Sequence, residues 1–452
     1  MNTNDTPVEI SEISEQRFNA FVVWARGAGP LAPTKEVAWL EIRPAKVLGV
    51  LFVDLTDREL HSCVLAPDLS GRYRGVRLLG PHADVRAAVN ATAEAMANVH
   101  ADYDNSRTQG DERPSENFFR VASNEDRLHV RFKYLRDQTS AVAARRLIEV
   151  AMRWYENQDG TFVEQFQTTA FDARVWELYV WALMREAGLR VEQPKPAPDF
   201  LARGVFGDFY VEATTANPPP VHNVPVPPET ADELFDYAHN YLPTRFSGPL
   251  VAKLRKRYWE RTGARKIPFV IAVQDFHQDL SMTWSQPALY EYLYGVRIED
   301  VERDGVVRQV EVPVGTLKWG TKELESGFFK LPDSERISAV IFNAAGTLSK
   351  FNRMGIAAGM GESSLLAFHR GSRYAEDNSG EVVPFSQQVG EGYEERWIDG
   401  TTVFHNPGAL YPLPPEALPG AAHVSERAGM REQSSPAGHL VTSTTSLVLP
   451  QG

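Results

Sequence analysis

Residues 198–215, PDFLARGVFGDFYVEATT, predict the central strand pairing of this chain. It holds two short apolar runs, PDFLAR and DFYVEATT, joined by a turn between Gly204 and Asp208. Short runs rich in β-branched and aromatic residues around a glycine-containing turn are typical of two antiparallel strands. This pairing predicts that residues near the start of the first strand lie beside residues near the end of the second.

The flanking sequence predicts a mixed sheet with helices packed on it. Residues 171–188 predict a helix with Asp172 as its N-cap and Gly188 as its stop. RVEQ at 190–193 predicts a further strand, a helix follows through 249–262, and PFVIAVQDF at 268–276 predicts an apolar strand. The order is helix, three strands, helix, strand, which indicates an α/β protein of the mixed α+β kind with a four-stranded mixed sheet.

The length of 452 residues predicts more than one domain. Composition shifts and turn-rich segments mark the expected boundaries. We expect a disordered leader at 1–16, a β-rich N-terminal domain at 17–115, a core domain at 116–285, a C-terminal α+β extension at 286–415 and a flexible tail at 416–452.

Composition limits the classes of function. The chain is 43% hydrophobic and 23% charged, with a net charge of −12, as expected for a folded protein that does not coat nucleic acid indiscriminately. We expect a cytoplasmic protein without a membrane segment, because no apolar run approaches the roughly 18 residues needed to span a bilayer. One cysteine, Cys63, excludes an internal disulfide and a multi-cysteine zinc site. Oxygen ligands, and therefore hard cations such as Mg²⁺, become the expected metal chemistry.

Three carboxylates stand out in the central segment. Glu177 is the only charged residue from Val175 to Met184, so it needs a partner inside a buried helix. Arg174 or a buried tyrosine is one alternative for that partner. Asp199 and Glu212 lie on the two paired strands, where two neighbouring carboxylates repel each other and favour a divalent cation between them. The alternatives are that Asp199 caps a turn and that Glu212 holds a basic residue of the next helix.

Pro198-Asp199 followed by Glu212-Ala213-Thr214, in this order of elements, resembles the PD-(D/E)XK core of restriction-endonuclease-like nucleases. The resemblance covers residues 171–276 and implies that Asp199 and Glu212 bind Mg²⁺ or Mn²⁺, that the Ala213 carbonyl is a further ligand and that Glu177 assists. In that superfamily a lysine two residues after the second acid positions or activates the attacking water.

Thr214 stands where the motif has its lysine. A threonine hydroxyl can hydrogen-bond a water molecule but carries no charge. Lys253 and Lys256, on the following helix, are both candidates to replace the lysine, as in superfamily members in which it has moved, and Lys253 is favoured because apolar residues flank it. The alternative is a core that has lost cleavage and kept binding.

A basic segment adjoins these residues. Between Arg245 and Lys266 there are eight basic residues and one acid. A solvated helix face is the simpler interpretation; beside a nuclease site, the segment predicts phosphate contacts and salt-sensitive DNA binding. The expected nucleic-acid-binding residues are Arg255, Arg257, Arg261 and Arg265.

The favoured hypothesis is therefore a metal-dependent nuclease that hydrolyses DNA phosphodiester bonds. The resemblance also implies a role in bacterial restriction or anti-phage defence, and it leaves a homodimer or a defence-system partner protein open. A degenerate fold that binds nucleic acid or protein is the alternative. An unrelated enzyme with a pocket formed by Lys350, Glu362 and His369 is a third hypothesis. Nucleotide-cradling and serine-hydrolase motifs such as GxxxxGK[ST] and GxSxG are absent from the sequence.

Overall fold

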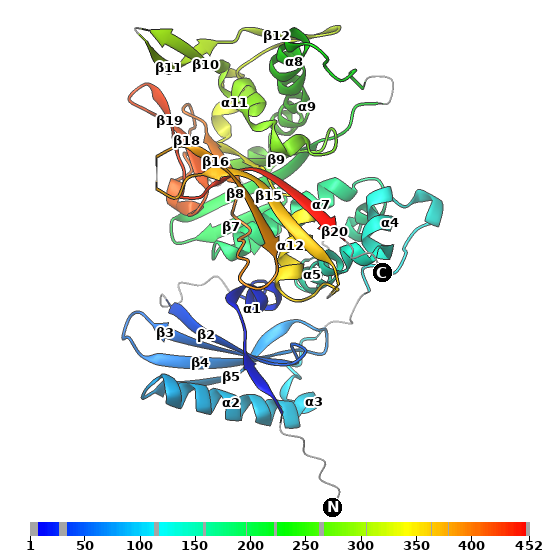
Figure 1. Ribbon diagram of the computed structural model, residues 1–452, viewed down its shortest axis with the longest axis vertical. Coiled ribbons are helices and arrows are strands. Elements are labelled where there is room, and N and C mark those ends of the chain that lie inside the picture. The colour runs from blue at the N-terminus through cyan, green and yellow to red at the C-terminus, as the bar shows by residue number, and fades with distance from the viewer. Residues whose placement is uncertain are drawn as a thin grey trace, which may run out of the picture.

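The computed structural model is a mixed α+β protein with five sheets in its described part (Figure 1). The expected mixed α+β class is therefore confirmed. The structure describes residues 8–26, 34–112, 117–156, 160–195, 197–220, 224–261, 266–303, 305–362, 364–377 and 379–448. Within these ranges, no helix combines the length and the apolar character that crossing a bilayer requires.

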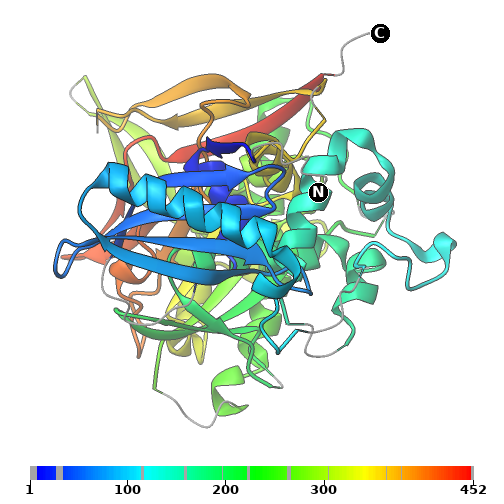
Figure 2. The same ribbon diagram turned by 90° about the horizontal axis from the view of Figure 1, so that it is seen from below.

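The N-terminal sheet is a five-stranded antiparallel meander in sequence order. Its elements are β1 (Ile10–Glu12), β2 (Thr34–Ile42), β3 (Val47–Asp54), β4 (Leu60–Pro67), β5 (Tyr73–His82) and the helix α2 (Val85–Ala101). α2 lies along the outer face of this sheet (Figures 1 and 2), where Ala88, Met96 and Val99 pack against it. The β-rich character expected for residues 17–115 matches this part of the structure.

α1 (Glu15–Val22) joins the N-terminal sheet to the rest of the molecule. Phe18 and Val22 on this helix pack into the sheet cluster, while Ala20 and Trp24 belong to the main core. Trp24 stacks on Trp181 with a centroid distance of 5.2 Å. Because β1 and α1 are ordered and packed, the expectation of a disordered leader is wrong for residues 8–16, and residues 1–7 lie outside the described part.

An eight-stranded mixed sheet forms the centre of the protein, in the order β19-β18-β17-β14-β9-β8-β7-β6. Its strands are β6 (Arg190–Glu192), β7 (Phe200–Gly204), β8 (Gly207–Ala216), β9 (Phe269–Asp275), β14 (Ala339–Asn343), β17 (Thr401–His405), β18 (Ala422–Arg427) and β19 (Met430–Ser434). β6, β7 and β8 are antiparallel, and β9 runs parallel to β8. The expected four strands are present, but the sheet has twice that number because four C-terminal strands extend it.

Helices α7 (Phe171–Glu186) and α9 (Leu242–Arg255) both contact β8. α7 is buried on nearly every side, as its apolar sequence predicts, and the Trp176 indole Nε1 donates to the carbonyl of Ala272 in β9 at 3.0 Å. These contacts fix the two helices beside the strands that carry Asp199 and Glu212.

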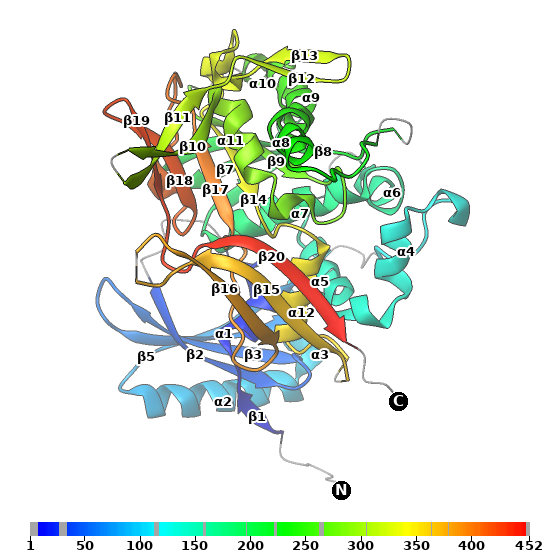
Figure 3. The same cartoon turned by 45° about the horizontal axis from the view of Figure 1, so that its top comes forward.

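The remaining elements surround this centre. The other helices of the described part are α3 (Tyr103–Ser106), α4 (Val130–Asp137), α5 (Val142–Met152), α6 (Phe162–Gln167), α8 (Ala231–Asp236), α10 (Tyr258–Arg261), α11 (Gln286–Tyr294) and α12 (Leu348–Ala357), with a π-helical turn at Tyr237–Tyr241. Two hairpins are formed by β10 (Val296–Arg303) with β11 (Val306–Pro313) and by β12 (Thr316–Trp319) with β13 (Lys322–Glu325). A three-stranded antiparallel sheet contains β15 (Leu366–Tyr374), β16 (Val382–Val389) and β20 (Leu440–Val448), as Figure 3 shows.

Two further expectations about domains need correction. Residues 416–448 are not a flexible tail, because β18 and β19 extend the central sheet and β20 pairs with β15. Residues 286–415 are not a separate extension, because β14 pairs with β9 and its side chains share one hydrophobic cluster with α7 and β8. Apart from the local β18–β19 hairpin, these pairings join segments separated in the chain, so local patterns in the sequence could not reveal them.

Candidate functional site

Asp199 and Glu212 lie directly opposite each other. Phe200 pairs with Val211 across β7 and β8, which places the preceding Asp199 beside the following Glu212. The Asp199 backbone N–H donates to Glu212 Oε2 at 3.1 Å, and the Ala213 N–H donates to Asp199 Oδ2 at 2.8 Å. The structure therefore brings the two acids together as the strand pattern predicts.

Lys253 brings a positive charge to this pair. Its Nζ lies 2.6 Å from Glu212 Oε1, and its side chain is 17% exposed. Thr214 is half-buried and lines the same cavity, but it contributes no charge. Lys256 also lines the cavity but is exposed after the end of α9. Of the two candidate lysines, Lys253 is the one that pairs with an acid of the site.

Glu177 faces a different set of partners. Its Oε1 accepts a hydrogen bond from the Tyr155 hydroxyl, and its Oε2 accepts one from the Arg174 guanidinium. The Arg174 Nε also donates to Gln165 Oε1 at 3.1 Å. Both partners that the sequence offered for Glu177, an arginine and a buried tyrosine, are therefore present at once.

A cavity of about 370 Å³ joins these groups. It is lined by Gln165, Ala170, Ala173, Arg174, Glu177, Ala197, Asp199, Glu212, Ala213, Thr214, Lys253, Lys256 and Tyr258. The Tyr258 ring, which sequence reasoning did not single out, lies within 6.0 Å of Lys253 Nζ and 5.6 Å of Lys256 Nζ, a range at which cations are attracted to aromatic faces. Asp199, Glu212, Glu177 and the predicted lysines therefore share one concave site.

Burial shifts the pKa of two carboxylates of the cavity. Burial raises the pKa of Asp199 to about 8, with a further contribution from the charges of Glu212 and Glu177, against the opposing effect of Lys253. Burial also raises the pKa of Glu177, although Arg174 opposes the shift. Burial and the neighbouring carboxylates therefore favour the protonated form of Asp199, and a cation bound there would have to displace that proton.

The donor set suits a hard divalent cation. The carboxylates of Asp199 and Glu212 and the carbonyl of Ala213 are oxygen ligands, and Mg²⁺ is commonly held by one or two carboxylates together with waters. In the described ranges, no group of three or more His, Cys, Asp or Glu side chains is arranged to hold a metal ion. Because Glu177 turns to Tyr155 and Arg174, a metal here would rely on the two paired acids.

Those of the expected nucleic-acid-binding arginines that the structure describes are not among the residues that line the cavity. Arg255, Arg257 and Arg261 are exposed, and the Arg261 guanidinium lies 5.6 Å from the Tyr258 ring. Arg257 contacts Asp333 at 3.4 Å and Glu260 at 3.2 Å, so part of its charge is already compensated. Arg265 lies outside the described residues.

The third hypothesis, an unrelated enzyme, expects a pocket formed by Lys350, Glu362 and His369. Lys350 is fully buried on α12, and its Nζ donates to the carbonyls of Trp397 and Asp399 at 3.1 and 2.9 Å. His369 Nδ1 lies 2.8 Å from the Tyr393 hydroxyl, whereas Glu362 is exposed. The pocket expected from Lys350, Glu362 and His369 is therefore not formed by those three side chains.

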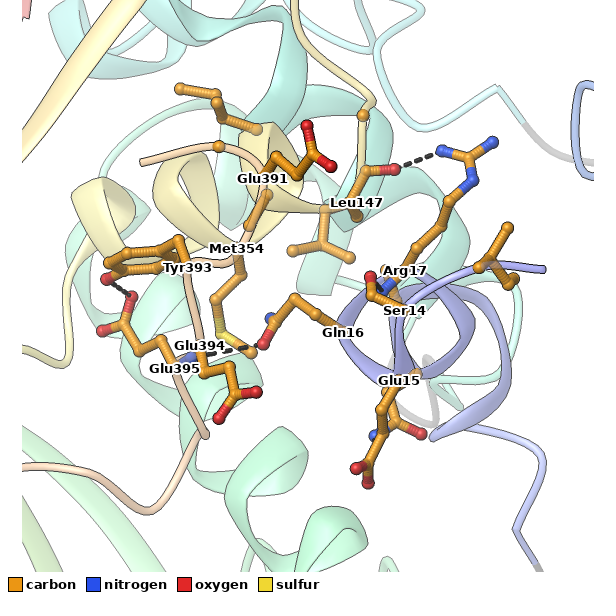
Figure 4. Close-up of a pocket in the computed structure, with 18 of the residues that line it drawn as sticks. Ser14, Glu15, Gln16, Arg17, Leu147, Met354, Glu391, Tyr393, Glu394 and Glu395 are labelled. Atoms are coloured by element: carbon orange, nitrogen blue, oxygen red, sulfur yellow. Dashed lines mark hydrogen bonds between the residues drawn. The ribbon is translucent and has the colours of Figure 1, made fainter. Parts of the chain in front are cut away.

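A larger cavity of about 940 Å³ does lie near this cluster, between α1, α12 and the segment after β16. Figure 4 shows Gln16 reaching the backbone N–H of Glu395 and Tyr393 bonded to the Glu395 carboxylate. Burial raises the pKa of Glu186, on the same wall, to about 7. Among the residues that line this cavity, acidic side chains outnumber basic ones. The charge of the cavity therefore does not suit a phosphate ligand.

Comparisons of the chain with protein-family models, with curated proteins and with solved structures found no match.

Proposed function

We propose that the protein is a metal-dependent nuclease that hydrolyses DNA phosphodiester bonds, with a restriction-endonuclease-like core formed by α7, β6 to β9 and α9. The observation that carries this proposal is the 2.6 Å contact between Lys253 Nζ and Glu212. It supplies, from α9, the positive charge that Thr214 does not provide. The element order and the pairing of Asp199 with Glu212 add support.

A divalent cation would add to the positive charge that the cavity offers a phosphodiester. Glu177 is compensated by Arg174 and Glu212 by Lys253, and the exposed Lys256 also lines the cavity. A divalent cation held by Asp199, Glu212 and the Ala213 carbonyl would make this set net positive. Such a cation stabilises negative charge on the phosphate and activates a water molecule. Lys253 would stabilise the transition-state charge from the other side of Glu212.

In this proposal, exposed basic residues bind the DNA backbone outside the cavity. Arg255, Arg257 and Arg261 are exposed, and in this proposal they contact phosphates that flank the scissile bond. Phosphate contacts of this kind make binding strongly salt-dependent. DNA binding should therefore weaken steeply as the salt concentration rises, even though the whole chain is acidic.

The test is cleavage of supercoiled plasmid and of single-stranded DNA by the purified protein with Mg²⁺ or Mn²⁺. We expect Asp199→Ala and Glu212→Ala each to lose about 10³-fold or more in rate and Lys253→Ala about 10²-fold. Asp208→Ala is the matched control, because this acid lies on the same strand β8 but outside the cavity, paired with Arg203 at 2.8 Å. It should cut like the wild type.

The degenerate alternative predicts a different result. A wild-type protein that binds DNA with strong salt dependence but cuts neither substrate with either metal would contradict the nuclease proposal and favour a binding module. Cutting that persists unchanged in both acid variants would show that the activity belongs to another site or to a contaminant.

A further inference from the structure

Arg174 is a second half-buried cation of the cavity, and the nuclease motif assigns it no role. It lies on α7, one helical turn before Glu177, and lines the cavity together with Asp199 and Lys253. Its side chain is 22% exposed, so the guanidinium is largely removed from bulk water while it still faces the cavity. An arginine in such a place is a strong candidate to contact a ligand.

The guanidinium of Arg174 is held from several sides. Nε and Nη2 both donate to Gln165 Oε1, and Nη1 donates to Glu177 Oε2. The ring of Phe162 lies 5.2 Å from the centre of the guanidinium. Tyr155 in turn donates to Glu177 Oε1 and so fixes the carboxylate that anchors Arg174. The side chain is therefore positioned before any ligand arrives.

The hydrogen bonds of the described residues leave part of the guanidinium free. A guanidinium has five N–H donors, and these contacts use one each on Nε, Nη1 and Nη2. The two remaining N–H groups sit on the two Nη atoms, and each can donate to a phosphate oxygen. Both oxygens of Glu177, by contrast, are already used as acceptors.

We propose that Arg174 contacts a phosphate of the nucleic-acid substrate inside the cavity, and that Glu177, Gln165 and Tyr155 are the residues that position it. This inference rests on the proposed function for the identity of the substrate. It also changes the role of Glu177, from an acid that assists the metal to the anchor of a phosphate-binding arginine.

The first experiment measures binding separately from cleavage. The affinity of a fluorescently labelled 12-nucleotide single-stranded DNA is measured in Ca²⁺ by anisotropy, and single-turnover cleavage is measured in Mg²⁺. We expect Arg174→Gln to weaken binding about tenfold and to slow cleavage about 10²-fold, and Arg174→Lys to recover part of both. Arg203→Gln, a surface arginine of β7 outside the cavity, is the control and should match the wild type.

Substitution of Arg174 leaves Glu177 buried without its cation, so folding needs its own control. The double variant Arg174→Gln with Glu177→Gln removes both charges and keeps side chains of similar size. Its thermal unfolding should be close to that of the wild type while its DNA affinity stays about tenfold weaker. Wild-type DNA affinity in Arg174→Gln or in the double variant would overturn the proposal.

The second experiment separates the two roles of Glu177. If Glu177 positions Arg174, the Mn²⁺ affinity of Glu177→Gln, measured by calorimetry, should stay within about twofold of the wild type, whereas Asp199→Ala should lose most of its Mn²⁺ binding. Loss of Mn²⁺ binding in Glu177→Gln would make Glu177 a metal ligand and refute the positioning role. If the wild type does not cut DNA, the proposed function fails, but the comparison of DNA affinities still decides whether Arg174 binds phosphate.

Discussion

The cavity acids and the Glu395 cluster are both buried groups of charges, but their carboxylates are compensated to different degrees. In the cavity, burial and the charges of Glu212 and Glu177 raise the pKa of Asp199 to about 8. At Glu395, burial would raise the pKa, but Arg353 and Lys350 outweigh it and lower the pKa to about 2. Both arrangements border a cavity, but the Glu395 carboxylate has more cations and hydrogen-bond donors around it than Asp199 has.

The contacts explain the difference. Glu395 accepts from Arg353 Nε at 2.9 Å and Nη2 at 2.6 Å and from the Tyr393 hydroxyl at 2.7 Å, with Lys350 Nζ 3.7 Å away. Two cations and a hydroxyl thus surround one carboxylate. The Asp199 carboxylate accepts a hydrogen bond from the Ala213 backbone N–H, and the nearby Lys253 is already paired with Glu212. A satisfied buried cluster holds the fold together, whereas an acid with too little compensating charge is typical of a functional site.

The largest effect on stability is expected from removing the negative charge of Glu395. Glu395→Gln leaves Arg353 and Lys350 buried without a counter-charge, so we expect a loss of about 3–5 kcal/mol in the free energy of unfolding. Chemical denaturation measures it. The control is Glu394→Gln, whose side chain is exposed and which should change stability by less than about 0.5 kcal/mol. Equal effects of the two variants would contradict the structural role of the cluster.

The affinity of the cavity for a metal ion should depend on pH, because Asp199 is a proposed ligand with a raised pKa. A cation at the cavity must displace the proton from Asp199, so the apparent affinity for Mn²⁺ should fall about tenfold for each pH unit below 8 and level off above it. Calorimetry at pH 6, 7, 8 and 9 tests this, with the released proton measured in buffers of different ionisation enthalpy. An affinity that does not change between pH 6 and 8 would argue against Asp199 as a ligand.

The two clusters should also have opposite effects on stability as the pH changes. The folded-state pKa of Asp199 is raised, so the folded state binds the proton more tightly than the unfolded chain and stability falls as the pH rises from about 4 to 8. Asp199→Asn should therefore stabilise the metal-free protein at pH 9, on the order of 2 kcal/mol, and much less at pH 4. Glu395 has a lowered pKa, so its contribution is present above pH 4.5 and is lost as the pH falls toward 2. Denaturation of Asp199→Asn across this range checks the sign.

The smallest effect is expected at Lys256. Because it lines the cavity but is exposed, Lys256→Ala should reduce cleavage only about two- to fivefold and lower the salt dependence of DNA binding slightly. A loss as large as that of Lys253→Ala would mean that Lys256 supplies the catalytic charge instead.

Local patterns were enough to place the paired acids. The apolar runs around the turn at Gly204 give β7 and β8, and antiparallel register then puts Asp199 opposite Glu212. The helix at 171–188 followed from its apolar run, and the structure has α7 at Phe171–Glu186. These features depend on residues close in the sequence, so periodicity and turn chemistry reveal them.

Other features of the site depend on side-chain directions that no local pattern fixes. Arg174 and Tyr258 were not assigned to the site from the sequence, and the choice between Lys253 and Lys256 rested only on flanking residues. Gln165 joins the network from α6, a helix that precedes the motif. The only sequence signal for Arg174 was the need of Glu177 for a partner, which did not say whether the pair serves structure or substrate.

By itself, the sequence determined the mixed α+β class, the order of elements from 171 to 276 and the adjacency of Asp199 and Glu212. The tertiary structure alone decided that the C-terminal strands complete the central sheet, that Lys253 pairs with Glu212 and that Glu177 turns to Arg174 and Tyr155. The physical reason is the same in each case. Strand and helix formation depends mainly on near neighbours, whereas sheet extension and the pairing of buried charges depend on which distant segments pack together.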